Sequence, residues 1–264
     1  MSFALRQAIT EPRGGYVFNG SNTRVDSSSG TLPVVNYPFT VSAWVSWNGT
    51  VDTRMYWSMG SDATTIHFWW AGVTSLGYPQ VSWRGDGTQQ NIVAITRMAT
   101  HRYYWVTWVG ESASLNSIYV NGRLENRSTA SGGSFNNSAW HVWGALKWTT
   151  GAPILYYGGN VVEPAIWNRA LTSREVFEAY RQGSRRYRKG NLVFYRDWLK
   201  GHESGAPYGT GNLVLAEINS PARTARHRVL AGYRTAIFAE AATTTFSRIV
   251  GARAGLAGPG GLAA

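Results

Sequence analysis

FTVSAWVSW, residues 39–47, is the stretch that best defines the fold class. Its apolar side chains recur at every second position and share one face of an extended strand: Phe39, Val41, Ala43, Val45 and Trp47. The opposite face carries Thr40, Ser42 and Ser46. This alternation predicts a half-buried strand, with one face in a core and the other toward solvent.

Similar short segments follow along the chain, separated by Gly, Asn, Asp, Ser and Pro. YYWVTWV at 103–109 is apolar on both faces, which predicts a central strand. Asn121-Gly122 after an apolar run predicts a tight hairpin, because both residues accept a positive φ. Further strands are expected near residues 16–19, 55–59, 66–70, 80–84, 92–96, 117–120, 141–146 and 161–167. This spacing predicts an all-β sandwich or barrel.

One helix interrupts the β pattern. Thr172 and Glu175 have the spacing of a capping box, in which each side chain accepts a hydrogen bond from the other residue's backbone. Leu171 and Val176 occupy the positions of a hydrophobic staple, Phe177 and Tyr180 extend the apolar stripe, and Gly183 follows. The spacing predicts a helix over residues 173–182 that closes the first domain.

Several of these segments resemble, in their order, one known superfamily. They are YVFNGS at 16–21, PFTVSAWV at 38–45, SIYVNG at 117–122, and AIWNRALT at 165–172 followed by Glu175 and Tyr180. Together they resemble the laminin G-like, concanavalin A-like lectin/glucanase superfamily. The resemblance implies a two-sheet antiparallel jelly-roll sandwich with one short C-terminal helix, which we assign to residues 1–183.

Composition limits the classes of protein that this chain can be. Of 264 residues, 44% are hydrophobic and 15% are charged, so the chain can bury a core. No apolar stretch approaches the roughly 20 residues that span a bilayer, and the first residues lack a secretory signal pattern. We therefore expect neither membrane insertion nor ordinary secretion. The absence of Cys excludes disulfides and thiolate metal sites.

The basic charge is concentrated at the C-terminal end. Residues 1–180 hold 12 basic and 10 acidic side chains, whereas residues 181–264 hold 13 basic and 4 acidic ones. Residues 191–199 and 213–218 could each add a strand, and from about Ser220 the chain is rich in Ala, Arg, Thr and Gly. We predict that residues 184–264 form a basic, partly extended region that anchors the protein to a partner. Its expected anchoring residues are Arg185, Arg186, Arg188, Arg226, Tyr233, Phe238 and Phe246.

The superfamily contains glycan binders, adhesion modules, hydrolases and structural modules, so function must come from a site. The resemblance implies that a hydrolase of this architecture would carry carboxylates in a Glu-x-Asp-x-Glu strand pattern, which this sequence lacks. The five His residues also lack metal-binding spacing. We therefore predict that the protein is not an enzyme.

Aromatic residues are the best candidates for glycan contacts, because sugar rings stack on Trp and Tyr faces. We select Trp69, Trp70 and Trp83, of which at most one of the adjacent pair should lie in the core. Core filling or a protein interface remains open for each. Calcium is the one cofactor considered, with Asp52, Asp62 and Asp86 as candidate ligands, and a plain β-turn role remains open for Asp86.

These features predict a structural protein of a large particle, such as a virion surface or capsid decoration protein, with a lectin-like domain facing outward. Its partners would be other subunits of the assembly, a capsid lattice above all, with surface glycans as a further class. The alternative is a glycan-binding adhesion module in an extracellular or cell-surface location. Basic and aromatic residues interleave only around Tyr187, which does not favour nucleic acid.

Overall fold

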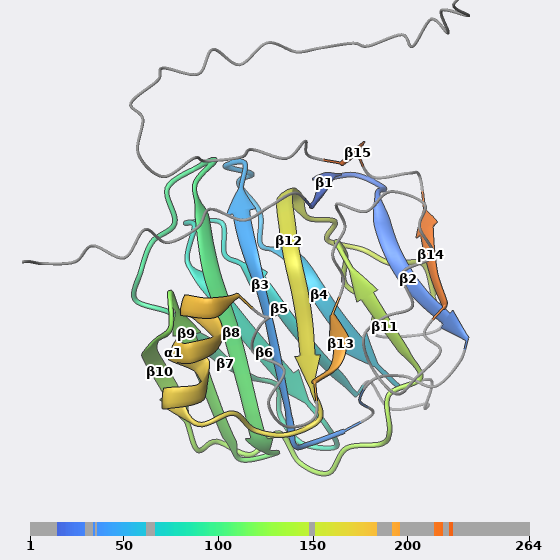
Figure 1. The fold of residues 1–264 in the computed structure, drawn as a ribbon. Coiled ribbons are helices and arrows are strands. Elements are labelled where there is room, and N and C mark those ends of the chain that lie inside the picture. The colour runs from blue at the N-terminus through green and yellow to red at the C-terminus, as the bar shows by residue number, and fades with distance from the viewer. Residues whose placement is uncertain are drawn as a thin grey trace, which may run out of the picture. The chain divides into compact units, whose positions relative to one another are not determined.

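The computed structural model describes residues 15–29, 34, 36–61, 67–147, 151–183, 192–195, 214–218 and 222–223. Within these residues the chain forms fifteen strands and one helix (Figure 1). The strands build two antiparallel sheets of a jelly-roll sandwich, which confirms the predicted fold class. In the same part of the chain, no helix has the length and apolar character needed to cross a membrane.

Two sheets face each other across the core. The first sheet has the order β10 (Arg123–Ser128), β9 (Leu115–Val120), β8 (Tyr103–Ser112), β3 (Phe39–Trp47), β12 (Gly158–Trp167), β1 (Tyr16–Asn19) and β15 (Ala222–Arg223), and β13 (Leu192–Tyr195) also pairs with β12. The second sheet has the order β14 (Val214–Ile218), β2 (Arg24–Ser29), β11 (Trp140–Trp143), β4 (Arg54–Gly60), β5 (Phe68–Val73), β6 (Pro79–Arg84) and β7 (Gln90–Val93). Hydrogen-bonded β3 and β12 lie in the middle of the first sheet (Figure 1).

The space between the sheets is filled largely by aromatic rings. The five alternating apolar residues of β3 all belong to this core, as the sequence predicted. The ring of Phe39 lies 5.1 Å from that of Trp108 in its own sheet and 5.9 Å from that of Trp57 in the opposite sheet. Such edge-to-face and tilted pairs add to the stabilisation that burial of large rings already gives. Many of the aromatic residues, which make up 14% of the sequence, therefore serve to fill the core.

The outer face of β3 is also buried, which corrects the prediction of a half-buried strand. Helix α1 (Ser173–Gln182) covers this side of the first sheet (Figure 1), and its Val176 and Ala179 join a second apolar cluster there. The cluster includes Trp44, whose ring lies 5.5 Å from that of Trp105 on β8. The period-2 pattern does not predict this burial, because the polar side chains of Thr40, Ser42 and Ser46 suggest a face exposed to solvent.

The local predictions for the hairpin and the helix are confirmed. Asn121 and Gly122 have φ values of 51° and 76°, as a type I′ turn requires. Thr172 is the N-cap of α1 and forms the predicted capping box with Glu175. Gly183 follows the helix with a φ of 77°.

The sandwich does not end at Gly183, which corrects the boundary expected from the sequence. β13 pairs with β12, β14 pairs with β2, and β15 pairs with β1. The first compact unit of the chain extends from Met1 to Val229. Without these later strands, part of the edges of β2 and β12 would have unpaired backbone N–H and C=O groups. β14 and β13 form hydrogen bonds with those edges. β13 and β14 fall within the two stretches, 191–199 and 213–218, in which the sequence allowed a strand.

Candidate ligand-binding pocket

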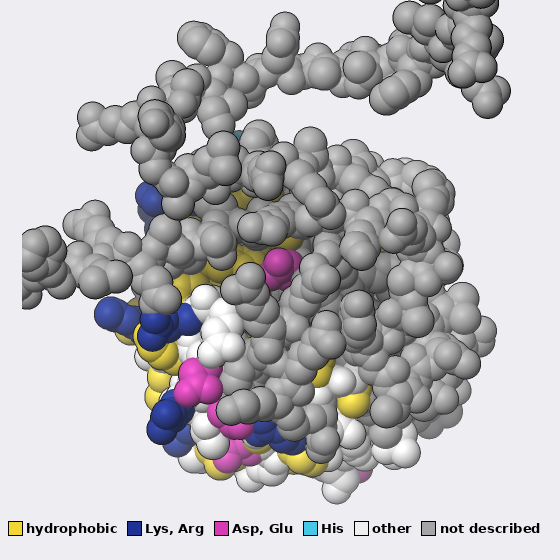
Figure 2. All heavy atoms as spheres, viewed as in Figure 1, with side chains coloured by type: hydrophobic (Ala, Val, Ile, Leu, Met, Phe, Trp, Pro, Cys, Tyr) yellow, Lys and Arg dark blue, Asp and Glu magenta, His cyan; other side chains and the backbone are white. Residues whose placement is uncertain are grey.

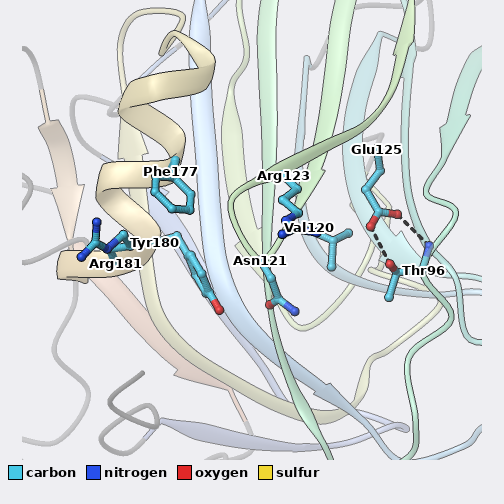
Figure 3. A pocket seen from close by; sticks show the side chains of 8 residues that line it. All are labelled: Thr96, Val120, Asn121, Arg123, Glu125, Phe177, Tyr180 and Arg181. Atoms are coloured by element: carbon cyan, nitrogen blue, oxygen red, sulfur yellow. Dashed lines mark hydrogen bonds between the residues drawn. The ribbon is translucent and has the colours of Figure 1, made fainter. Parts of the chain in front are cut away.

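A pocket lies between α1 and the hairpin that joins β9 to β10 (Figure 3). Its volume is about 520 Å³, within the usual range for small-molecule sites. Its lining comes from α1, the hairpin and the segment after β7: Thr96, Val120, Asn121, Arg123, Glu125, Phe177, Tyr180 and Arg181. We call it the α1–β10 pocket. Figure 2, in the orientation of Figure 1, shows basic side chains beside apolar and acidic ones on the side that carries α1.

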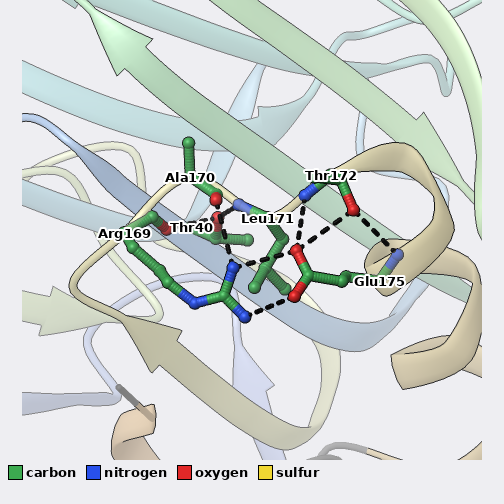
Figure 4. A network of polar contacts seen from close by, with 6 residues as sticks. All are labelled: Thr40, Arg169, Ala170, Leu171, Thr172 and Glu175. Carbon is green, nitrogen blue, oxygen red and sulfur yellow. Dashed lines mark hydrogen bonds and ion pairs between the residues drawn. The ribbon is translucent and has the colours of Figure 1, made fainter. Parts of the chain in front are cut away.

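An ion pair and the capping box fix the first turn of α1 (Figure 4). Both guanidinium Nη atoms of Arg169 donate to the carboxylate of Glu175, at 2.9 and 2.7 Å. The backbone N–H of Thr172 donates to the same carboxylate at 2.9 Å, and its hydroxyl accepts from the Glu175 N–H at 3.3 Å. This bidentate geometry holds the helix start in one orientation.

Thr40 connects that turn to the first sheet (Figure 4). Its hydroxyl donates to the carbonyl of Arg169 at 2.9 Å and accepts from the N–H of Leu171 at 3.0 Å. Leu171 itself is buried in the outer cluster with Val176. Because β3 is a central strand, these bonds fix α1 relative to the sheet that also carries the β9–β10 hairpin.

The turn glycine lets the hairpin approach the helix closely. A Cβ atom at position 122 would lie 2.9 Å from Cδ1 of Tyr180 and 3.1 Å from Cδ2 of Phe177. Ordinary carbon contacts are longer than this, so any larger residue would push the helix and the hairpin apart. Gly122 thus meets two requirements, a positive φ and a close contact with two helix residues that line the pocket.

Phe177 presents its ring to the pocket rather than to the core. It is 42% exposed, whereas Val176 and Ala179 are buried, so the predicted apolar stripe of the helix is corrected at this position. The guanidinium carbon of Arg181 lies 5.7 Å from the centre of the Phe177 ring. An exposed aromatic ring offers a large apolar surface to a ligand.

Tyr180 is half-buried and packs against the sheet. Its ring lies 5.7 Å from that of Trp44. Burial raises the pKa of Tyr180, and the nearby positive charge of Arg123 partly offsets that rise. The net direction is upward, so the hydroxyl stays protonated at neutral pH and can donate a hydrogen bond.

Two acceptors in the pocket already have partners. The Glu125 carboxylate accepts from the backbone N–H of Thr96 at 2.7 Å and from its hydroxyl at 2.5 Å (Figure 3). The side-chain oxygen of Asn121 accepts from the backbone N–H of Trp105 at 3.0 Å. These bonds hold the hairpin in place, and each oxygen of the Glu125 carboxylate accepts one hydrogen bond from Thr96.

The three tryptophans selected from the sequence are not exposed, which corrects that prediction. Trp69 and Trp83 are both 0% exposed and belong to the core between the sheets. Trp70 is 4% exposed and packs on the opposite face of β5 with Met55, Phe68 and Leu146. The rule that adjacent strand residues face opposite sides is obeyed, but the second side is covered as well. None of these rings offers a face on which a sugar could stack.

The two described calcium candidates each have a different side-chain partner. Asp52 pairs with Arg54 at 3.0 Å, and Asp86 is bonded to His67 at 2.7 Å, while Asp62 lies outside the described residues. Because Nδ1 of His67 accepts from the N–H of Asn136, its Nε2 carries the hydrogen that is donated to Asp86. The described part of the chain contains no group of three or more His, Asp or Glu side chains placed to hold a metal ion. Calcium binding at these aspartates stays a prediction.

The anchoring residues predicted in the C-terminal region fall outside the described residues. They are Arg185, Arg186, Arg188, Arg226, Tyr233, Phe238 and Phe246. Their role stays a prediction.

Sequence reasoning did not single out the α1–β10 pocket. The sequence prediction places its two aromatic residues on the apolar stripe of the helix and gives no role to Arg123. The available signal was that Val176 and Phe177 are adjacent: successive residues point in directions about 100° apart on a helix, so the two cannot both lie at the centre of one buried face.

The chain was compared with known proteins at the levels of sequence family and structure. A heptameric SAP-like pentraxin from Limulus polyphemus has a TM-score of 0.55 at 16% identity, covering 70% of this chain and 93% of the pentraxin. The CBM40 of Ruminococcus gnavus IT-sialidase, solved with α2,3-sialyllactose bound, has a TM-score of 0.52 at 12% identity, covering 64% and 96%. The K499G mutant of NanB sialidase from Streptococcus pneumoniae has a TM-score of 0.53 at 18% identity, covering 62% of this chain and 27% of that sialidase.

These structural similarities show a shared fold. A search of curated protein sequences found no match. The sequence-family comparison is more specific, because a model described as the concanavalin A-like lectin/glucanases superfamily matches residues 19–177. That range contains the predicted strand, hairpin and capping-box segments and most of the described sandwich. The chain therefore belongs to the concanavalin A-like lectin/glucanases superfamily.

Proposed function

We propose that this protein is a non-catalytic glycan-binding domain and that the α1–β10 pocket is its ligand site. The observation that carries the proposal is the exposed ring of Phe177 in a pocket of about 520 Å³, beside the hydroxyl of Tyr180 and two guanidinium groups. An aromatic face with nearby polar groups is the usual chemistry for holding a pyranose ring.

The fold comparisons support the same class of ligand. The R. gnavus CBM40 shares the sandwich and was solved with a sialylated sugar bound. At 12% identity this likeness concerns the fold, so the choice of pocket rests on the residues described above.

A binding role fits the pocket better than hydrolysis. Glycoside hydrolysis commonly uses two carboxyl groups on either side of the bond that is cleaved. Among the described residues that line the pocket, Glu125 is the one carboxylate, and both of its oxygens accept hydrogen bonds from Thr96. We therefore propose recognition without turnover.

The more specific role predicted from the sequence, a virion surface or capsid decoration protein, depends on the basic charge of residues 181–264. Neither the described sandwich nor the comparisons add support for that role or for a virion location. It stays a prediction, whereas glycan recognition has both a pocket and a superfamily in its favour.

The test is saccharide binding by the full chain and by Phe177→Ala. We expect binding to at least one member of a panel of neutral and acidic oligosaccharides in calorimetry, and a loss of about tenfold or more in affinity in Phe177→Ala. Leu76→Ala is the control, because Leu76 is also an exposed apolar residue but lies in the β5–β6 turn. Equal loss in both variants, or no binding to any member of the panel, would contradict the proposal.

A further inference from the structure

The side chains that line the α1–β10 pocket carry more hydrogen-bond donors than acceptors. Arg123, Arg181, the Tyr180 hydroxyl and the side-chain N–H₂ of Asn121 can all donate to a ligand. The acceptors on Glu125 and Asn121 are already bonded to Thr96 and Trp105. A neutral sugar hydroxyl uses both a donor and an acceptor in its site, whereas an oxyanion only accepts.

The two arginines are also free of the ion pairs that hold other arginines of this protein. Within the described residues, carboxylate partners are found for Arg24, Arg54, Arg127, Arg169 and Arg174. No carboxylate in the same part of the chain pairs with Arg123 or Arg181. Arg181 instead rests on the Phe177 ring. Two unneutralised guanidinium groups therefore flank one pocket.

These groups lie on separate elements that are held in place. Arg181 projects from α1, which the Arg169–Glu175 pair fixes at its start, and Arg123 begins β10 directly after the Gly122 turn. Figure 3 shows Phe177 and Tyr180 between the two elements and Arg123 facing them. A sugar bound against Phe177 would lie beside Arg181, with Arg123 on the opposite side of the pocket.

From these observations we infer that the α1–β10 pocket selects acidic sugars, with Arg123 and Arg181 binding an oxyanion substituent while Phe177 holds the ring. This inference rests on the proposed glycan-binding function. The shared chemistry is a carboxylate or a sulfate group on a pyranose, since guanidinium forks fit the oxygens of both. Tyr180 supplies an additional neutral donor.

The experiment compares matched acidic and neutral sugars by calorimetry with the full chain. The pairs are α2,3-sialyllactose with lactose, and galactose 6-sulfate with galactose, so that a carboxylate and a sulfate are tested separately. We expect at least one acidic member to bind about tenfold or more tightly than its neutral partner. This preference should decrease as salt rises from 50 to 500 mM, because salt screens exposed charges.

The variants Arg123→Gln and Arg181→Gln should each reduce affinity for the acidic sugar while changing affinity for the neutral one by less than about twofold. Arg102→Gln is the matched control, because Arg102 is exposed and lies outside the pocket. An acidic preference that survives in the Arg123→Gln/Arg181→Gln double variant overturns the inference. Equal binding of acidic and neutral sugars overturns it too but leaves the proposed function standing, whereas absence of all sugar binding removes both.

Discussion

Gly122 in the β9–β10 turn packs directly against the ring of Tyr180 in α1, so closely that a Cβ atom there would lie 2.9 Å from Cδ1 of that ring. The two residues are 58 positions apart in the sequence, and their contact sets the spacing between the helix and the hairpin. The α1–β10 pocket is lined by residues of both elements, so this spacing also affects its width.

Gly122→Ala should therefore destabilise the fold by about 2 kcal/mol, the sum of left-handed backbone strain and overpacking. Gly20→Ala is a matched control, since Gly20 has a φ of 78° but its nearest neighbour for a Cβ is 3.5 Å away. Urea denaturation should show a clearly smaller loss for Gly20→Ala than for Gly122→Ala. Equal losses would mean that contact with Tyr180 contributes nothing.

Glu175→Ala should weaken the attachment of α1, because it removes the reciprocal cap and the bidentate pair with Arg169 together. We expect a loss of about 1–2 kcal/mol in the free energy of unfolding. Glu178→Ala removes the pair with Arg174, whose side chain is 89% exposed, and should change stability by less than about 0.5 kcal/mol. Similar losses in both variants would contradict the role given to the Glu175 network.

His141 should make stability depend on pH. Burial lowers the pKa of His141 from its ordinary value of 6.5 to about 4, although its hydrogen bond to the Val34 carbonyl opposes the shift. The unfolded chain then binds the proton more readily between these two values. Stability from this residue is complete above pH 6.5 and is lost as pH falls toward 4, on the order of 3 kcal/mol in all.

His141→Gln should remove that part of the pH dependence, because glutamine can donate a hydrogen bond but does not titrate in this range. Chemical denaturation at several pH values between 4 and 7 measures the difference between variant and parent. His101→Asn provides the control, since His101 is exposed and its φ of 61° suits asparagine. A slope unchanged in His141→Gln would refute this assignment.

Truncation distinguishes the sandwich from the rest of the C-terminal region. A chain ending at Gly183 lacks β13, β14 and β15, which pair with β12, β2 and β1, and we expect a large loss of thermal stability. A chain ending at Val229 keeps all three strands and should melt within a few degrees of the full chain. If the shorter chain is equally stable, the three strands contribute little to the fold.

The chain that ends at Val229 also tests the predicted anchoring role of the residues after it. If those residues anchor the protein to the predicted particle, this chain should bind the particle more weakly than the full chain.

Local chemistry made much of the fold predictable. The Asn121-Gly122 turn and the Thr172 capping box each depend on a few neighbouring residues, and both occur as predicted. The apolar face of residues 39–47 also lies in the core as predicted, although the other face is buried too. β2 was missed because its RVDSSS sequence has little apolar alternation and is defined by pairing with β11 and β14. Pairing of that kind depends on partners far along the chain.

The pocket could not be predicted for a similar reason. The sequence identified the hairpin and the helix, but their packing depends on the absent side chain of Gly122 and on the bond from Thr40 to the Arg169 carbonyl. Trp69 and Trp83 are candidates for glycan contacts in the sequence because their rings are large, yet their burial depends on packing against the opposite sheet. Phe177 extends the apolar stripe in the sequence, but Val176 and Ala179 are the residues of α1 that are buried.

The most direct test of the account is a map of the ligand footprint by amide NMR during a sugar titration. If the α1–β10 pocket is the glycan site, the largest chemical-shift changes should fall on residues 121–123 and 177–181, and in Phe177→Ala they should require about tenfold or more sugar to develop. Saturable changes confined to loops elsewhere, such as residues 48–53 or 85–89, with the pocket amides unmoved, would contradict it.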